Sequence, residues 1–99
     1  ADTATPQAKA FITAYQAAYS KVPDDVAALT YDSFGLLFQA LKAAGKADRE
    51  AVRAALAAIT QYDGVTGTMQ FKGTGDPIKS AVVIQIKDGK FKYYQTAKP

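Results

Sequence analysis

The spacing of the apolar residues changes once along this chain of 99 residues, and that change limits the folds open to it. Between positions 6 and 59 apolar residues recur every three or four positions, which is the repeat of helices with one buried side. Beyond position 65 they alternate with polar residues, as the two faces of a strand do. This order predicts an α/β chain of about three helices followed by a short strand and a β-hairpin.

The predicted helices have polar caps at their starts, where a side-chain oxygen accepts a hydrogen bond from a free backbone N–H. The caps are Thr5 for the first helix, Asp24 or Asp25 for the second, and Asp48 for the third. The first helix stops before Pro23, and the second stops at Gly45, which tolerates the left-handed conformation of a helix end.

The second helix, over positions 26–44, is apolar around most of its circumference and therefore needs cover on two sides. Gly35 in its interior costs about 1 kcal/mol relative to alanine, so we expect a neighbouring backbone to approach the helix there. Tyr31 and Asp32 are polar residues on which a ligand could depend. Their spacing alone favours a capping, paired or water-facing role over a ligand site.

A turn at Tyr62-Asp63-Gly64 is predicted to lead into a short strand over Val65–Phe71, and a glycine-rich loop over Lys72–Pro77 follows. The loop sequence KGTGDP lacks the spacing of a phosphate-binding loop and has no helix after it. As a calcium loop it offers one carboxylate, Asp76, where several oxygen ligands are needed. A plain connection is therefore the favoured interpretation.

Two strands, over positions 81–87 and 90–95, flank Asp88-Gly89, a preferred pair for a two-residue type I′ hairpin turn. The register places Ile86 opposite Phe91 and Ile84 opposite Tyr93 on an apolar face. Lysines and aromatic rings in this segment are also groups that bind single-stranded nucleic acid. Because two of the rings turn toward the apolar face, we interpret the lysines as a solvated face that protects the strand edge, and we expect no nucleic-acid partner.

The chain offers little for catalysis or metal binding. It has no histidine and no cysteine, which excludes Ser-His and Cys-His pairs and thiolate metal sites. Asp24 and Asp25 are sequence neighbours that do not face each other across a substrate, so capping explains them better. The net charge of +3 is spread along the chain. We expect no catalytic residues, no cofactor and no metal site, and hence no enzyme.

The first eleven residues, ADTATPQAKAF, lack a basic region followed by an apolar one, so we expect no signal peptide in this chain. The longest apolar runs fall far short of the roughly 18 residues that span a bilayer.

Three segments follow one another in a distinctive order: positions 8–45 around the phrase AALTYDS, positions 48–59 with DREAVRAALAAI, and positions 62–94 with DGVTG, GDP and KDGKF. This co-linear set resembles the C-terminal part of the branched-chain amino-acid-binding proteins. These are type I periplasmic solute-binding proteins of ABC importers, and the resemblance covers nearly all of the chain. The family's members are several times longer and have two α/β lobes around a ligand cleft.

The resemblance implies that positions 1–99 are one partial domain. Positions 1–71 resemble a portion of the first lobe, and positions 78–99 resemble the terminal strands of the second, with a crossing near Lys72–Ile78. It further implies capture of an amino acid or similar small molecule, delivery to a membrane permease of an ABC importer, and a periplasmic or other extracytoplasmic location. One family position that lines the ligand side-chain pocket, often aromatic, matches Val26, and Ala27 is the next candidate.

A second interpretation remains beside the resemblance: a freestanding α+β interaction module with a basic strand face. The two differ in whether the chain continues upstream. In either case a helix that is apolar on two sides and a hairpin with an apolar face leave much surface to cover. Even a few hundred Å² of exposed apolar surface corresponds to several kcal/mol. We therefore expect the chain alone to self-associate, with strand exchange as one route.

Overall fold

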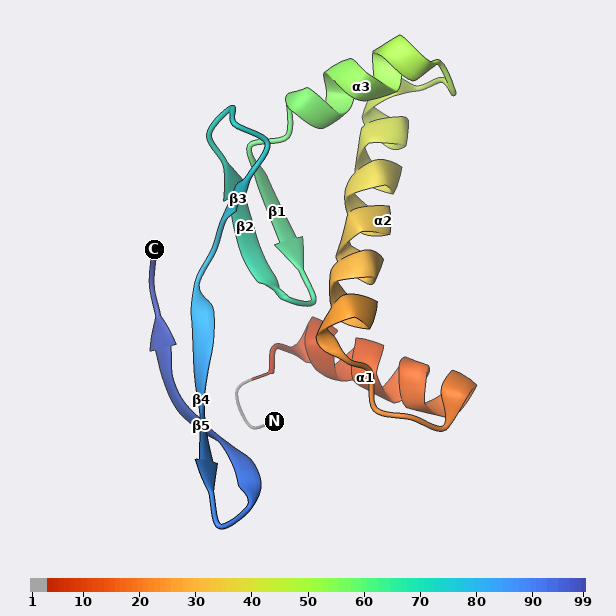
Figure 1. Ribbon diagram of the computed structural model, residues 1–99. Coiled ribbons are helices and arrows are strands. Elements are labelled where there is room, and N and C mark those ends of the chain that lie inside the picture. The colour runs from red at the N-terminus through yellow and green to blue at the C-terminus, as the bar shows by residue number, and fades with distance from the viewer. Residues whose placement is uncertain (1–3) are drawn as a thin grey trace.

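A computed structural model describes residues 4–99 of the chain (Figure 1). Three helices precede five strands, with these bounds: α1 Pro6–Tyr19, α2 Asp25–Ala44, α3 Arg49–Ala57, β1 Gln61–Gly64, β2 Gly67–Phe71, β3 Pro77–Ile78, β4 Ala81–Lys87 and β5 Lys90–Ala97. The α/β class and the three helices are confirmed, and the strand region is richer than predicted. Within residues 4–99, the helices are too short or too polar to cross a bilayer.

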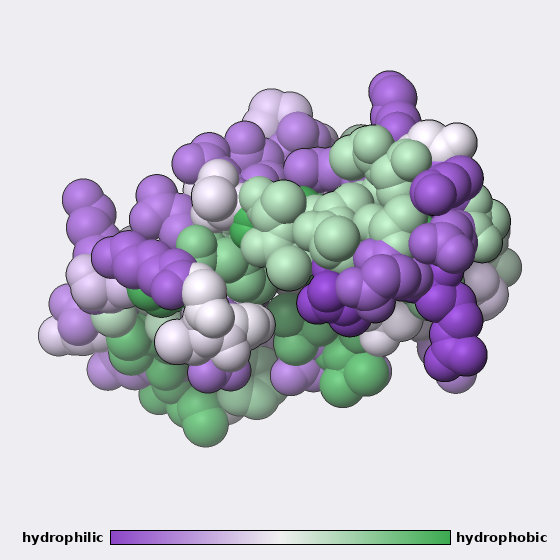
Figure 2. All heavy atoms as spheres, turned by 90° about the horizontal axis from the view of Figure 1, so that it is seen from above, coloured by the Kyte–Doolittle hydropathy of each residue, from purple (hydrophilic) through white to green (hydrophobic). Residues whose placement is uncertain are grey.

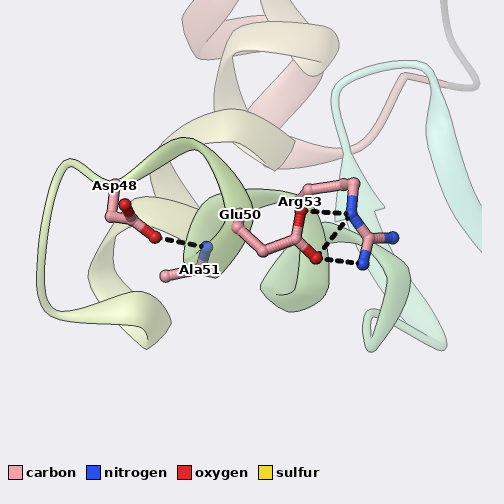
Figure 3. A network of polar contacts seen from close by, with 4 residues as sticks. All are labelled: Asp48, Glu50, Ala51 and Arg53. Carbon is pink, nitrogen blue, oxygen red and sulfur yellow. Dashed lines mark hydrogen bonds and ion pairs between the residues drawn. The ribbon is translucent and has the colours of Figure 1, made fainter.

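All three predicted helix caps are confirmed. Thr5, Asp24 and Asp48 each accept a hydrogen bond from the backbone N–H three residues on, at 3.1, 2.7 and 2.9 Å. Gly45 ends α2 in the left-handed conformation with φ 68°. Figure 3 shows the start of α3, where Asp48 caps the helix and the exposed side chains of Glu50 and Arg53 form an ion pair.

The predicted turn at Tyr62-Asp63-Gly64 is wrong, because these residues belong to β1. They pair with β2 in antiparallel register, with Tyr62 opposite Met69 and Gly64 opposite Gly67. The turn itself is Val65-Thr66, which the sequence pattern places in the strand predicted over Val65–Phe71. The error has a long-range cause, since the backbone N–H groups of both turn residues donate to Asp32 of α2.

The glycine-rich segment after β2 returns the chain to the same sheet. β3 pairs with β2 through Gln70 opposite Ile78 and Phe71 opposite Pro77, which gives a sheet in the order β1-β2-β3. Lys79-Ser80 then leads into a separate two-stranded sheet of β4 and β5. The link between the two sheets therefore lies just beyond the segment where a crossing was predicted.

The hairpin register is confirmed, with Ile86 opposite Phe91 and Ile84 opposite Tyr93. Asp88 and Gly89 have φ values of 53° and 70°, as a type I′ turn requires. One feature was not predicted: the register shifts between Val83 and Ile84, so that Tyr94 becomes the extra residue of a β-bulge. Bulges bend a strand and increase its twist.

Very little of the chain is buried. Among the described residues, the buried apolar side chains are Ala40 and Met69 alone, and every residue of β4 and β5 is exposed. The accessible surface is 7637 Å², against about 5400 Å² for a compact monomer of this mass. The radius of gyration is 15.8 Å, against about 13 Å for a compact chain of this length.

The arrangement of the elements explains this excess surface. α3 packs beside the C-terminal half of α2, the β1-β2-β3 sheet lies along α2, and the hairpin extends away from the helices (Figure 1). β4 and β5 have substantial contact only with each other. Apolar side chains reach the surface in several places on the face seen in Figure 2. The fold thus consists of a helical body and a hairpin with two exposed faces.

Candidate functional site

The best-built polar cluster of the described residues surrounds Asp32. This carboxylate is 2% exposed and lies on the side of α2 that faces the β1–β2 turn. It accepts hydrogen bonds from the backbone N–H groups of Val65 at 2.8 Å and Thr66 at 3.0 Å, and from the Thr66 hydroxyl at 2.6 Å. Gly64 lies so close that a Cβ atom there would overlap the carboxylate. Asp32 is therefore a fastening between α2 and the sheet, which its spacing in the sequence did not reveal.

The hydrogen bonds continue from Thr66 to the link between the two sheets. The Lys79 ammonium donates to the Thr66 hydroxyl at 2.9 Å. A hydroxyl has one hydrogen and two lone pairs, so Thr66 can donate to Asp32 while it accepts from Lys79. The three side chains thus form a hydroxyl-bridged pair of opposite charges, and all buried polar side-chain atoms found in residues 4–99 have a partner.

A neighbouring group does approach α2 closely at Gly35, but this group is a side chain. The prediction that a neighbouring backbone would approach there was therefore wrong. A Cβ atom at Gly35 would overlap the phenol oxygen of Tyr62, which reaches α2 from β1. Burial raises the pKa of the Tyr62 phenol above its ordinary value, and the charges of Asp32 and Tyr31 add to this rise. The phenol is consequently a neutral wall of the region beside Asp32 at physiological pH.

An open groove of about 1070 Å³ runs between α1, α2 and the start of the sheet. Its lining residues are mostly small or aromatic: Gln7, Ala10, Phe11, Ala14, Tyr15, Ala18, Tyr19, Ala27, Thr30, Tyr31, Phe34, Gly35, Phe38, Tyr62, Asp63 and Val65. Along one side the rings form a series, since Tyr19 and Tyr15, and Phe11 and Tyr31, have ring centroids 4.7 Å apart. Such a lining fits apolar groups and holds no concentrated charge.

The two residues predicted to contact a ligand lie at the start of α2 and differ in their surroundings. Ala27 is half-buried and lines the groove. Val26 is 65% exposed and is not part of the groove lining. The structure therefore places one of the two beside a concave surface and leaves the other facing solvent.

The remaining candidates have structural explanations. Asp24 is used as the α2 cap, and the loop around Asp76 is exposed. The lysines of the hairpin lie on exposed strands. Residues 4–99 contain no group of three or more acidic, histidine or cysteine side chains placed to hold a metal ion.

A family model described as periplasmic binding protein matches residues 1–90. The chain belongs to the periplasmic binding protein family. The resemblance expected from the sequence is thereby confirmed at the level of the family.

Three solved structures of solute-binding proteins superpose on nearly the whole chain. The leucine-binding protein LivK of Thermotoga maritima has 32% identity and a TM-score of 0.84 over 99% of this chain and 28% of its own. LivJ of Streptococcus pneumoniae, solved with isoleucine, has 33% identity and a TM-score of 0.86 over 98% and 27%. A solute-binding protein of an ABC transporter from R. palustris, solved with benzoate, has 28% identity and a TM-score of 0.83 over 99% and 28%.

A comparison with curated proteins gave no match. The chain spans 27–28% of the length of these three solved solute-binding proteins. The family and these structures are binding proteins rather than enzymes.

Proposed function

We propose that this chain is part of a longer two-lobed solute-binding protein that captures a small carboxylic acid outside the cytoplasm and delivers it to an ABC importer. The observation that carries the proposal is the match to periplasmic binding proteins over residues 1–90 and over 98–99% of the chain in the two amino-acid-binding structures. The accessible surface of the chain, which exceeds that of a compact monomer of its mass, supports the proposal. A part of a two-lobed protein exposes the faces that pack against the rest of its lobes in the longer protein. The function is binding without chemical conversion.

The proposed ligand has a carboxylate beside an apolar group. Of the similar structures, LivK is named as a leucine-binding protein, LivJ was solved with isoleucine, and the R. palustris protein was solved with benzoate. These three ligands share both features. Ala27 and Val26 contribute to the pocket for the apolar group at the start of α2, where Ala27 lines the groove of small and aromatic residues. A valine at position 26 in place of an aromatic wall leaves room that another part of the ligand or of the longer chain fills.

The proposed division of the chain follows its two sheets. The body of α1–α3 and β1–β3 belongs to the first lobe, and β4 and β5 belong to the second. The absence of substantial contact between the hairpin and the helices supports this division. Each unit then finds its missing cover in a different lobe.

The test uses the complete reading frame that encodes this segment. The purified product is screened by thermal unfolding with leucine, isoleucine and benzoate, and with lysine and glutamate as charged controls. Saturating ligand at about 100 times its Kd raises the stability by about 2.7 kcal/mol, which a melting curve resolves. A reading frame that begins near residue 1, or a product that responds to none of the apolar acids, contradicts the proposal.

The residue assignment has its own test in the longer protein. Ala27→Trp and Val26→Trp each fill the space of the proposed pocket with a large side chain, so each should weaken ligand binding by roughly tenfold or more. A tenfold loss of affinity corresponds to about 1.4 kcal/mol of binding free energy. Val22→Trp is the matched control, because Val22 is 71% exposed in the loop before α2. Equal affinities of all three variants would remove Val26 and Ala27 from the site.

The 99-residue chain by itself is proposed to self-associate and to bind no ligand tightly. Permanent interfaces bury about 2,000–5,000 Å² in total, and the surface excess of this chain falls on that scale. Sedimentation velocity at falling concentration tests the first statement, and calorimetry with leucine tests the second. A compact monomer at low micromolar concentration contradicts self-association.

A further inference from the structure

The connection between the helical body and the hairpin is short and carries a side-chain fastening. β3 ends at Ile78 and β4 begins at Ala81, so only Lys79 and Ser80 lie between two separately hydrogen-bonded sheets. Because the hairpin has substantial contact only within itself, these two residues determine how it is oriented. A joint of two residues with free side chains would allow a wide range of orientations.

We propose that the Lys79–Thr66–Asp32 hydrogen-bond chain sets the orientation of the hairpin relative to the helical body. Lys79 sits at the first position of the joint, and its ammonium is held at 2.9 Å by a hydroxyl that is itself held at 2.6 Å by a buried carboxylate. The anchor is rigid because Asp32 also accepts from two backbone N–H groups. The fastening confines free rotation largely to Ser80.

The chemistry of the three groups favours this arrangement over a chance surface contact. Lys79 is half-buried, and a lysine that loses water is normally paired with a partner. Hydrogen bonds with a charged partner are shorter and stronger than neutral ones, and successive bonds polarise one another. The Thr66 hydroxyl can serve both neighbours because it donates to one and accepts from the other.

The consequence for binding rests on the proposed function, whereas the fastening itself does not. If the hairpin belongs to the second lobe, the joint is one of the connections that bend when the lobes close. Hinge motions are absorbed by a few residues between rigid elements. A fastening at Lys79 would favour one lobe orientation in the absence of ligand and therefore tune the apparent affinity.

The test measures the orientation directly in the 99-residue chain. The chain has no cysteine, so Lys42→Cys on α2 and Lys90→Cys on the hairpin provide two unique attachment points for nitroxide labels. Pulsed electron double resonance then gives the distance distribution between them. Dilution with unlabelled chain removes the distances between labels on different molecules.

Lys79→Met keeps most of the unbranched apolar stem of the side chain and removes its ammonium group. We expect it to broaden the distance distribution, with the ratio of unfastened to fastened molecules raised roughly tenfold, a factor that corresponds to about 1.4 kcal/mol. Lys72→Met is the matched control, since Lys72 is exposed in the loop before β3, and it should leave the distribution unchanged. The proposal would be overturned if the distance distributions of Lys79→Met and Lys72→Met were equally wide. It would also be overturned if the distribution of the chain without either substitution were as wide as that of Lys79→Met.

A second pair of variants separates the hydroxyl from the bulk of Thr66. Thr66→Ser keeps the hydroxyl and should retain the narrow distribution, while Thr66→Val removes it and should broaden the distribution as Lys79→Met does. Circular dichroism checks that the helices are retained, and if Thr66→Val loses them the comparison of Lys79→Met with Lys72→Met decides alone. These measurements need no ligand, so a failure of the proposed function leaves their outcome intact.

Discussion

Replacement of Asp32 by asparagine is the sharpest test of how the helical body is held together. The change keeps the shape of the side chain but removes its charge and replaces one acceptor oxygen by a donor NH₂ group. Three donors converge on the carboxylate: the N–H groups of Val65 and Thr66 and the Thr66 hydroxyl. At least one of them must lose its acceptor or face another donor.

The expected cost follows from these contacts. A hydrogen bond to a charged group contributes about 1.5–3 kcal/mol, and a buried donor without an acceptor costs about 1–3 kcal/mol. Because the three bonds share one anchor, their losses do not add, and we expect a net destabilisation of about 3 kcal/mol for Asp32→Asn. That value is a large part of the stability of a small domain.

Two measurements check this value. Urea unfolding followed by far-ultraviolet circular dichroism, at one fixed protein concentration, gives the change in stability. Hydrogen exchange of the Val65 and Thr66 amides gives the local effect, which about 3 kcal/mol would speed by roughly a hundredfold. Asp25→Asn is the control, since Asp25 is exposed in the first turn of α2 and its charge there contributes about 0.3–1 kcal/mol. An Asp32→Asn chain as stable as Asp25→Asn, with unchanged exchange at both amides, would refute the role of Asp32 as a fastening.

Three further outcomes follow from the structure. Gly35→Ala should destabilise the chain by about 1 kcal/mol, because overpacking against Tyr62 exceeds the helix-propensity gain, and Tyr62→Phe should reduce that cost in a double-mutant cycle. The pKa of Tyr62 is raised in the folded chain. Its contribution to the free energy of unfolding should therefore be complete at pH values below the ordinary tyrosine pKa, and it should be lost as the pH rises through the pKa of the folded chain. Tyr62→Phe should remove this part of the alkaline loss in urea titrations between pH 9 and pH 11, a window set by the ordinary tyrosine pKa of about 10. Gly89→Ala should weaken the hairpin by about 1–2 kcal/mol through its positive φ alone, since open space surrounds that position, and cross-strand nuclear Overhauser effects between β4 and β5 should diminish.

Local signals in the sequence predicted the parts of the fold that depend on neighbouring residues. Thr5, Asp24 and Asp48 cap helices because their oxygens reach N–H groups three residues away, and Asp88-Gly89 forms its turn through its own backbone preferences. The register of the hairpin follows from that turn. None of these features requires knowledge of a distant contact.

The errors lie where distant residues determine the structure. Val65-Thr66 is a turn because a carboxylate more than thirty positions earlier accepts both of its N–H groups. Gly35 was correctly expected to permit a close approach, but the approaching group is the side chain of Tyr62. The assignment of Val26 and Ala27 came from the family resemblance, and only Ala27 lines the groove. A polar residue within an apolar helix was the one available signal for the role of Asp32.

The groove and the joint are connected by the same short set of contacts. Tyr62 and Val65 line the groove, and the Val65 N–H donates to Asp32, whose other oxygen accepts from the Thr66 hydroxyl that Lys79 contacts. These contacts form a contiguous physical route from the groove to the hairpin, and the coupling energy between a ligand in the groove and the orientation of the hairpin is the measurement that tests this route. An open groove alone encloses too little of a small ligand, since binding sites normally bury most of their ligand's surface. The proposed capture of a carboxylic acid therefore requires a second wall, and the residues proposed to orient the hairpin are placed where they would control how that wall approaches.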